Sequence, residues 1–247
     1  SHDVHSELAP PVVTPITIMG WVRDGQSAVA PLTNLPLVGL EVSVPGIGTM
    51  VTDQNGQISP DLTAPVTITV YADGIHSQLV SGANAPTASA TVQPGVPQTI
   101  QMSTQTASTN ESAHLATWYW IHAINDMCRS ILGNSTQLNT ADNIRPTVNI
   151  ASTCNAYYTN NTINFYAAGG TCNNTGFSTV VVHEWGHGLD ERQSQQHGLQ
   201  LGAVEVAGTR ANARQIEVGE VDQLAECRRQ IAVAHALGQQ RPPGVDR

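Results

Sequence analysis

The segment Val180-Val181-Val182-His183-Glu184-Trp185-Gly186-His187 decides how the rest of the sequence is interpreted. An apolar run leads directly into it, as expected for a buried helix. Residues four apart in a helix lie on one face, so His183 and His187 can direct both imidazoles at one ion. Zinc binds neutral imidazole nitrogen at about 2.0–2.1 Å. We therefore predict that both histidines are zinc ligands.

Glu184 follows the first histidine, where it can face a metal-held water without being a ligand. This is the position of the general base in His-Glu-x-x-His metallopeptidases. Such a glutamate takes a proton from water and later passes it to the leaving amine. Metzincins are excluded, because the residue ten positions after His183 is Gln193 and not histidine.

Three upstream segments add to the motif: Asn155-Ala156-Tyr157-Tyr158, Ile163-Asn164-Phe165-Tyr166 and Gly169-Gly170. With the motif they resemble the core of the thermolysin-type gluzincin metallopeptidases, over about residues 111–191. In that family the Asn-Ala-aromatic-aromatic segment is an edge strand over the active cleft and binds substrate backbone as an added strand. The resemblance implies that Asn155 and the backbone of Ala156 hold a peptide. The alternative for Asn155 is an ordinary turn residue.

The third zinc ligand has no clear match. Gluzincins take it from a glutamate on a later helix, in a Glu-x-x-x-Asp setting whose aspartate orients a zinc histidine. Glu217 is the nearest match, but its aspartate comes one residue too late. Glu205 and Glu220 are the other candidates. Asp190, a turn beyond His187, is expected either to support a ligand or to substitute for one.

Residues 192–247 differ in composition from the segment before them. They hold seven of the ten arginines and no aromatic residue. A gluzincin lobe needs aromatic core residues and a histidine that stabilises the oxyanion. Neither His197 nor His235 stands in a matching motif. We therefore expect an incomplete C-terminal lobe that brings no glutamate to the zinc; the competing expectation is that Glu217 completes the site.

The N-terminal part has the pattern of strands. Val38, Leu40, Val42 and Val44 alternate with small or polar residues, and the segment Asp53-Gln54-Asn55-Gly56 is a turn signal. Val66, Ile68 and Val70 repeat the alternation. This pattern predicts a small β-sandwich. It resembles the carboxypeptidase-regulatory-like sandwiches that accompany secreted peptidases, which implies a secreted protein. A polar linker over 103–111 then leads to a helix, with Asn110 as its cap and Gly133 at its end.

Composition limits the partners. The net charge is −9, and all ten basic residues are arginine. Nucleic acid is therefore not expected as a partner, since phosphate binding needs a basic face. No apolar run approaches the roughly 20 residues of a membrane span, so no membrane partner is expected either.

The four cysteines are Cys128, Cys154, Cys172 and Cys227. An even count fits disulfides, and Cys154 and Cys172 flank one predicted hairpin, so we expect these two to be bonded. Four buried free thiols are the alternative. Zinc binding by the cysteines is disfavoured, because no Cys-x-x-Cys spacing occurs.

Together these features predict an α+β chain, with a β-sandwich over 1–103 and a zincin-like domain with an active-site helix over 104–247. The expected function is that of a zinc endopeptidase acting on peptide or protein substrates, with calcium as a further candidate ion. The alternative is a catalytically inactive zinc-binding or adhesive module. An unambiguous third ligand would separate the two.

Overall fold

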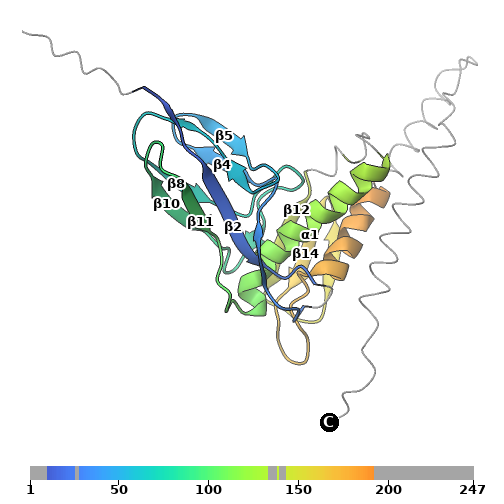
Figure 1. Ribbon diagram of the computed structural model, residues 1–247. Helices are drawn as coiled ribbons and strands as arrows, with labels where there is room; N and C mark the ends of the chain where they lie inside the picture. Colours follow the sequence, from blue (N-terminus) through green and yellow to red (C-terminus); the bar gives the residue numbers. More distant parts are fainter. Residues whose placement is uncertain (1–9, 26–27, 133–137, 139–142, 192–247) are drawn as a thin grey trace, which may run out of the picture.

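The computed structural model describes residues 10–25, 28–132, 138 and 143–191. This part of the chain is mixed α+β, with short strands in small sheets beside α1 (Thr109–Leu132) and a helix over residues 178–191, called the motif helix below (Figure 1). The predicted α+β class is confirmed. The strands are β1 (Val12–Val13), β2 (Ile16–Val22), β3 (Thr33–Pro36), β4 (Glu41–Val44), β5 (Gly48–Val51), β6 (Gln57–Ile58), β7 (Asp61–Leu62), β8 (Val66–Val70), β9 (Ser81–Gly82), β10 (Ala88–Val92), β11 (Gln98–Gln101), β12 (Arg145–Ile150), β13 (Ala156–Thr159) and β14 (Thr162–Tyr166).

The N-terminal strands form several small sheets. In the largest of these, β2 pairs with β3, β6 and, in parallel, β11. The predicted alternation is confirmed from Leu40 onward, because Leu40, Val42 and Val44 are all buried. The strand begins later than predicted, since Gly39 turns the chain with φ +79°. The predicted turn before β6 is also present: Asp53 Oδ1 accepts hydrogen bonds from the backbone N–H groups of Asn55 and Gln57.

Helix α1 begins with a capping box. The Ser108 N–H donates to Glu111 Oε2 over 2.7 Å, and the Glu111 N–H donates back to Ser108 Oγ over 3.3 Å. Ser108 is therefore the cap, and the sequence prediction of Asn110 was wrong by two positions. Asn110 is not available as a cap because its side-chain oxygen accepts from the Ala168 N–H, 2.9 Å away.

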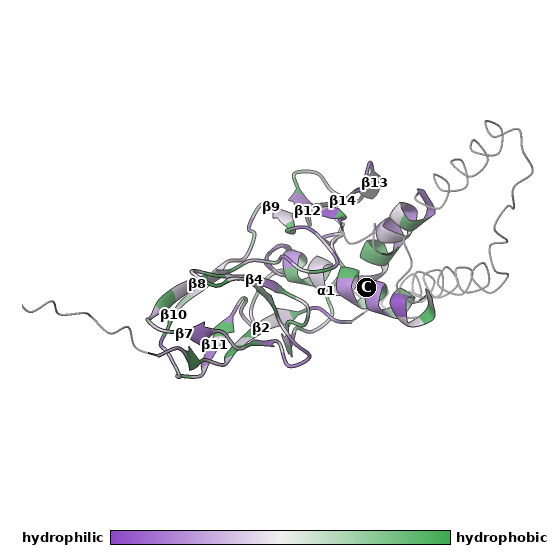
Figure 2. Cartoon of the chain, turned by 90° about the horizontal axis from the view of Figure 1, so that it is seen from above, coloured by the Kyte–Doolittle hydropathy of each residue, from purple (hydrophilic) through white to green (hydrophobic). Residues whose placement is uncertain are grey.

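A second sheet has the strand order β13-β14-β12-β9, and the four strands follow one another in this order in Figure 2. Its last strand, β9, comes from the N-terminal part of the chain and pairs in parallel with β12. Gly82 makes this pairing fit. Its φ is +123°, and a Cβ at this position would overlap the carbonyl oxygen of Val148. The two halves of the chain therefore share one sheet.

Helix α1 also contacts both halves, through β2 on one side and β12 on the other. The approach to β2 is close, since a Cβ on Gly20 would lie 3.0 Å from Leu115 Cδ1. One cluster of buried apolar side chains includes residues of β2, α1, β14 and the motif helix, such as Ile18, Trp118, Phe165 and Trp185. Among the described residues, no helix is both long and apolar enough to cross a membrane.

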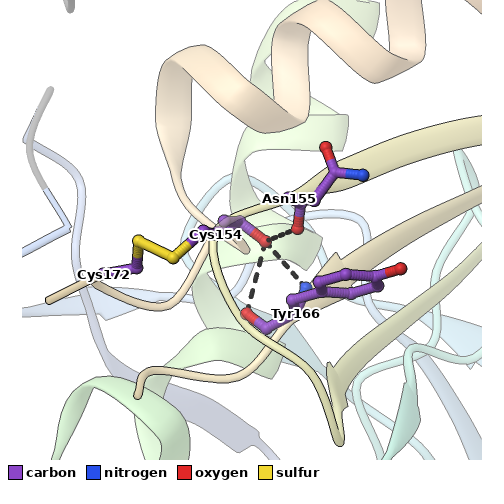
Figure 3. Close-up of a disulfide and its surroundings, with 5 residues drawn as sticks. Cys154, Asn155, Tyr166 and Cys172 are labelled. Atoms are coloured by element: carbon purple, nitrogen blue, oxygen red, sulfur yellow. Dashed lines mark hydrogen bonds between the residues drawn. A yellow bond between two sulfur atoms is a disulfide. The ribbon is translucent and has the colours of Figure 1, made fainter. Parts of the chain in front are cut away.

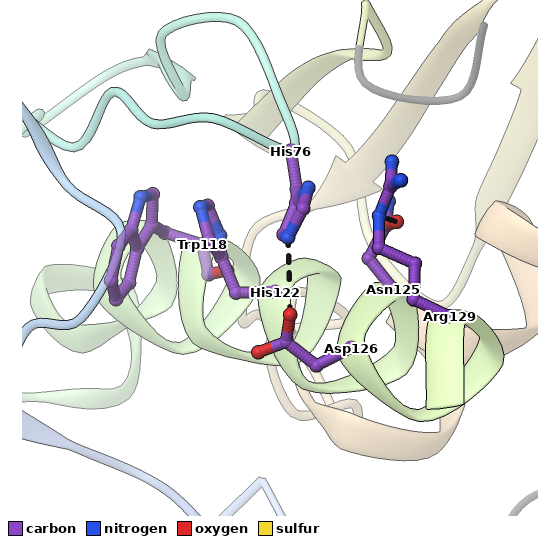
Figure 4. Close-up of polar contacts among 6 residues, drawn as sticks. All are labelled: His76, Trp118, His122, Asn125, Asp126 and Arg129. Carbon is purple, nitrogen blue, oxygen red and sulfur yellow. Dashed lines mark hydrogen bonds and ion pairs between the residues drawn. The ribbon is translucent and has the colours of Figure 1, made fainter. Parts of the chain in front are cut away.

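The loop before β9 docks on α1 through a cluster of polar side chains (Figure 4). His76 Nε2 donates to Asp126 Oδ1 over 3.1 Å, and its ring lies 5.2 Å from that of His122. His122 Nδ1 donates to the Trp118 carbonyl over 2.9 Å. Gly74 lets the loop approach, because a Cβ there would lie 2.6 Å from His122 Nε2. This histidine cluster joins the N-terminal part to the middle of α1.

Candidate metal centre and substrate cleft

The motif helix is anchored by its apolar face. The backbone N–H groups of Val180 and Val181 donate to the Phe177 carbonyl and close its first turn. Trp185 is fully buried, and so are the apolar residues four positions to either side of it, Val181 and Leu189. Because the buried residues recur with the helical period, the histidines of the motif lie on the opposite, accessible face.

His183 and His187 meet on that face, as predicted. Their Nε2 atoms are 3.1 Å apart and their ring planes are almost perpendicular, at 83°. Two nitrogens bound to one tetrahedral zinc ion at about 2.05 Å would be about 3.3 Å apart. The pair therefore fits one metal ion with little movement of either side chain. The same separation also fits an N–H···N hydrogen bond between neutral imidazoles.

Both histidines line an open cleft of about 630 Å³. Glu184 lines it as well, and its side chain is only 6% exposed. The predicted base therefore lies in the same cleft as the predicted ligands. The remaining lining residues come from β13, from the turn after it and from the end of the motif helix: Ala156, Tyr157, Tyr158, Thr159, Asn160 and Glu191.

Strand β13 is at the edge of its sheet and forms one wall of the cleft. The Tyr166 N–H donates to the Asn155 carbonyl over 3.2 Å, so this opposed pair is a hydrogen-bonded one. Opposed pairs alternate along an antiparallel ladder. Ala156 is the next residue, and its N–H and C=O therefore point away from β14, toward the free edge. This orientation is the one that an added peptide strand requires.

Asn155 lies between Cys154 and the first residue of β13 (Figure 3). Its side chain is exposed and is not among the residues that line the cleft. Its carbonyl is used within the protein, since it also accepts a hydrogen bond from Thr175 Oγ1 over 2.9 Å. Of the two residues expected to hold substrate, Ala156 lines the cleft and Asn155 borders it.

The predicted disulfide between Cys154 and Cys172 is confirmed, with a Cα–Cα distance of 5.2 Å (Figure 3). Cys154 immediately precedes Asn155, and Cys172 lies in the loop that leads to the motif helix. The bond therefore ties the start of β13 to the segment before the predicted zinc ligands.

A third ligand does not join the histidines within the described part of the chain, where no three His, Cys, Asp or Glu side chains converge as a metal site. Asp190 is exposed on the motif helix and does not line the cleft. The candidates Glu205, Glu217 and Glu220 lie outside the described residues. The identity of the third ligand thus stays a prediction.

No protein-family model, curated protein or solved structure matches the chain. The proposed resemblance to gluzincins consequently rests on the sequence motifs quoted above. The geometry of the cleft is the independent observation on which a functional proposal can be built.

Five of the lining residues were not predicted as site residues: Tyr157, Tyr158, Thr159, Asn160 and Glu191. Tyr158 lies on β13, and its hydroxyl donates a short hydrogen bond to Glu191 Oε2. Glu191 is four residues beyond His187, so the same helical spacing that paired the histidines would have placed it on their face. The pairing with Tyr158 had no signal in the sequence, because it depends on how the sheet packs beside the helix.

Buried amides position the start of the motif helix. Asn174 Nδ2 donates to Asn149 Oδ1 over 2.6 Å and to Asn110 Oδ1 over 2.8 Å, and its own oxygen accepts from the Gly176 N–H over 2.8 Å. Asn149 has φ 56° and lies at an irregularity of β12 that turns its side chain into this network. The network connects α1, β12 and the loop before the motif helix.

Away from the cleft, two buried histidines stay neutral. Burial lowers the pKa of His122 to about 4, with a smaller opposing effect from the Trp118 carbonyl. Burial also lowers the pKa of His114 to about 4, partly offset by the Gly82 backbone. Both are on α1, and neither lines the cleft. They bear on stability rather than on the proposed chemistry.

Proposed function

We propose that this protein is a zinc-dependent endopeptidase, built as an N-terminal β-sandwich followed by a zincin-like domain. The observation that carries the proposal is the 3.1 Å separation of the His183 and His187 Nε2 atoms in one cleft with Glu184. A pair of imidazoles at this spacing, with a carboxylate beside it, is the arrangement that metal-assisted hydrolysis of an amide requires.

His183 and His187 would hold the ion through their Nε2 atoms. Zinc supplies a Lewis acid that polarises a carbonyl and makes water more acidic. Glu184 accepts the proton from the attacking water and donates it to the departing amine nitrogen. The low exposure of Glu184, 6%, limits competing bulk water around this carboxylate.

The peptide substrate would lie along the edge of β13. The outward-facing N–H and C=O of Ala156 would pair with its backbone, so binding would depend little on the substrate's sequence at that position. Asn155, at the border of the cleft, would contact the same backbone through its exposed side chain. A structural disulfide is typical of oxidising compartments, which supports a secreted, extracellular protein. Calcium is a second candidate ion.

The decisive experiment measures zinc stoichiometry and casein hydrolysis on the same preparations of wild type and Glu184→Gln. The wild type should bind one zinc per chain and hydrolyse casein. Glu184→Gln should keep its zinc and lose at least a hundredfold in rate, because a general base contributes about 10²–10⁴-fold. An active wild type together with an equally active Glu184→Gln would refute the proposed mechanism.

A second candidate function is a catalytically inactive zinc-binding or adhesive module. It is favoured by one observation, that the described residues bring no third ligand to the histidine pair. In that case the wild type would bind zinc and leave casein intact under every condition. The same experiment therefore separates the two candidates.

A further inference from the structure

Two carboxylates face each other where β4 meets the loop before β9. The Glu41 N–H donates to the Asp73 carbonyl over 3.1 Å. The residue before Glu41, Leu40, forms an antiparallel bridge with Gly74, the residue after Asp73. In an antiparallel pairing, one step forward on one segment matches one step back on the other. Glu41 is therefore directly opposite Asp73, and their side chains leave the same face of the pairing.

This opposition is unfavourable when both carboxylates are ionised. Directly opposed residues have Cβ atoms about 4.5–5.5 Å apart, and like charges at this spacing destabilise the pairing. The Glu41 and Asp73 side chains are half-buried, so salt screens their repulsion less than it would on an open surface. A cation held by both carboxylates would replace the repulsion with attraction.

Both carboxylates line a cavity of about 460 Å³. Among the described residues, none lines both this cavity and the cleft of the histidine pair. Ser77 lines the cavity too. It is only 2% exposed, and its Oγ has no hydrogen-bond partner in the part of the chain that the structure describes. Buried hydroxyls are rarely left without a partner, because an unsatisfied one costs free energy. This oxygen is a second, independent sign of a ligand.

The cavity offers oxygen ligands. Besides the two carboxylates and the hydroxyl, its lining includes the side-chain amides of Gln78 and Asn143, and its described residues include no histidine or cysteine. Zinc prefers nitrogen and sulfur, whereas calcium and magnesium prefer oxygen. Magnesium needs a near-ideal octahedron, but calcium accepts 6–8 oxygens in irregular geometry and can take several from water. Mixed donors from a strand and a loop therefore suit calcium.

We propose that Glu41, Asp73 and Ser77 form a calcium site that ties β4 to the loop before β9. The site goes beyond the proposed peptidase function and does not depend on it. The same loop carries His76, which contacts Asp126 of α1 (Figure 4). A bound ion would therefore strengthen the attachment of the N-terminal part of the chain to α1.

The test is a calcium titration of the full chain after its metals have been removed with a chelator. Calorimetry should give a Kd of about 10⁻⁴–10⁻³ M, the range of calcium sites in extracellular modules. The Tm should rise with calcium concentration, because an ion that binds only the folded state stabilises it. Magnesium should bind more weakly than calcium. No calcium binding at ten times the upper end of that range, or tighter binding of magnesium, would overturn the inference.

Substitutions locate the ion. Glu41→Gln and Asp73→Asn should each weaken calcium binding at least tenfold, because each removes one of two charged ligands. Without calcium, each should be at least as stable as the wild type, since the like-charge repulsion is gone; this separates loss of the site from loss of the fold. Ser77→Ala should weaken binding about fivefold, the equivalent of one hydrogen bond. Asp61→Asn, an equal change of charge on β7 and outside the cavity lining, should bind calcium as the wild type does.

Two further results separate this inference from the peptidase proposal. Wild-type calcium affinity in both Glu41→Gln and Asp73→Asn would show that the ion binds elsewhere, and the inference would be wrong. His183→Ala should bind calcium as the wild type does, because that histidine lines the other cleft. Zinc binding and casein hydrolysis therefore test the peptidase proposal alone, and calcium affinity tests this site alone.

Discussion

The His183–His187 pair depends on a single helix for its geometry. Both side chains leave the same helical face, and their Nε2 atoms are already 3.1 Å apart. Neither histidine needs another part of the chain to bring it to its partner. Zinc affinity should therefore be sensitive to each imidazole and tolerant of changes elsewhere along the cleft.

We predict that His183→Ala and His187→Ala each reduce zinc affinity by at least a hundredfold. Each change removes one of the two nitrogen ligands, and a single imidazole cannot chelate. Zinc affinity is measured by competition with a chromophoric chelator. Asn160→Ala, which alters the cleft wall without removing an imidazole, serves as the control and should bind zinc as the wild type does. Retention of one tightly bound zinc by His183→Ala would disprove the ligand assignment.

At the level of elements, the disulfide holds β13 against the loop that leads to the motif helix. Its two cysteines are 18 residues apart. The histidine pair lies within one helix and does not rely on this bond, whereas Ala156 comes two residues after Cys154. Loss of the disulfide should therefore affect the proposed peptide-binding edge more than the proposed zinc ligands.

The double replacement Cys154→Ser and Cys172→Ser should lower the free energy of unfolding by about 3 kcal/mol, the value for a closed loop of this length. Urea denaturation measures this. In the same variant, peptide affinity should fall more than zinc affinity does. A larger loss of zinc than of peptide binding would show that the bond positions the motif helix instead of β13.

The sequence predicted those elements whose signal is local. Val66, Ile68 and Val70 alternate over a single strand, and the helix that carries His183 and His187 shows its period within a few residues. The cap of α1 was misassigned because Asn110 and Ser108 are both good caps, and a contact with the distant Ala168 decided between them. No local sequence pattern predicted that Ser81 and Gly82 form a strand, because β9 depends on its pairing with the distant β12. Contacts between Tyr158 and Glu191 likewise depend on packing between elements.

For the molecule as a whole, the histidine cluster makes stability depend on pH. His122 is neutral in the folded protein, because burial lowers its pKa from 6.5 to about 4. Its surroundings are His76 from the loop and Asp126 on α1, with Arg129 near Asp126. A histidine with a lowered folded pKa contributes its full stability above the unfolded pKa, and that contribution is lost as pH falls toward the folded value.

We predict that the free energy of unfolding falls between pH 6.5 and pH 4 and that His122 and His114 both contribute. For His122 the loss should reach roughly 3 kcal/mol, with a limiting slope of about 1.4 kcal/mol per pH unit. Urea titrations across this range give the slope. The Asp126 pKa is lowered by its hydrogen bond with His76, so its contribution disappears only at still lower pH.

His122→Gln should take up one proton fewer on unfolding than the wild type does. The slope of the free energy of unfolding against pH should fall accordingly, even if the change destabilises the protein at every pH. His114→Gln, on the same helix but away from the histidine cluster, should reduce the slope in the same way, because burial is also the main cause of the lowered His114 pKa. Proton uptake on unfolding that is identical in wild type and His122→Gln would contradict the lowered pKa of His122.

The pairing of β9 with β12 also has a consequence for the order of events during synthesis. Ser81 and Thr147 are 66 residues apart in the chain. At about 5–20 residues per second, a ribosome finishes β12 roughly 3 to 13 s after β9. During that interval the N-terminal strands of the nascent chain can form, but β9 cannot pair because β12 has not yet been synthesised. The sheet β13-β14-β12-β9 is therefore completed late in synthesis. A pause in translation between residues 82 and 147 would prolong the time for which β9 is exposed and unpaired.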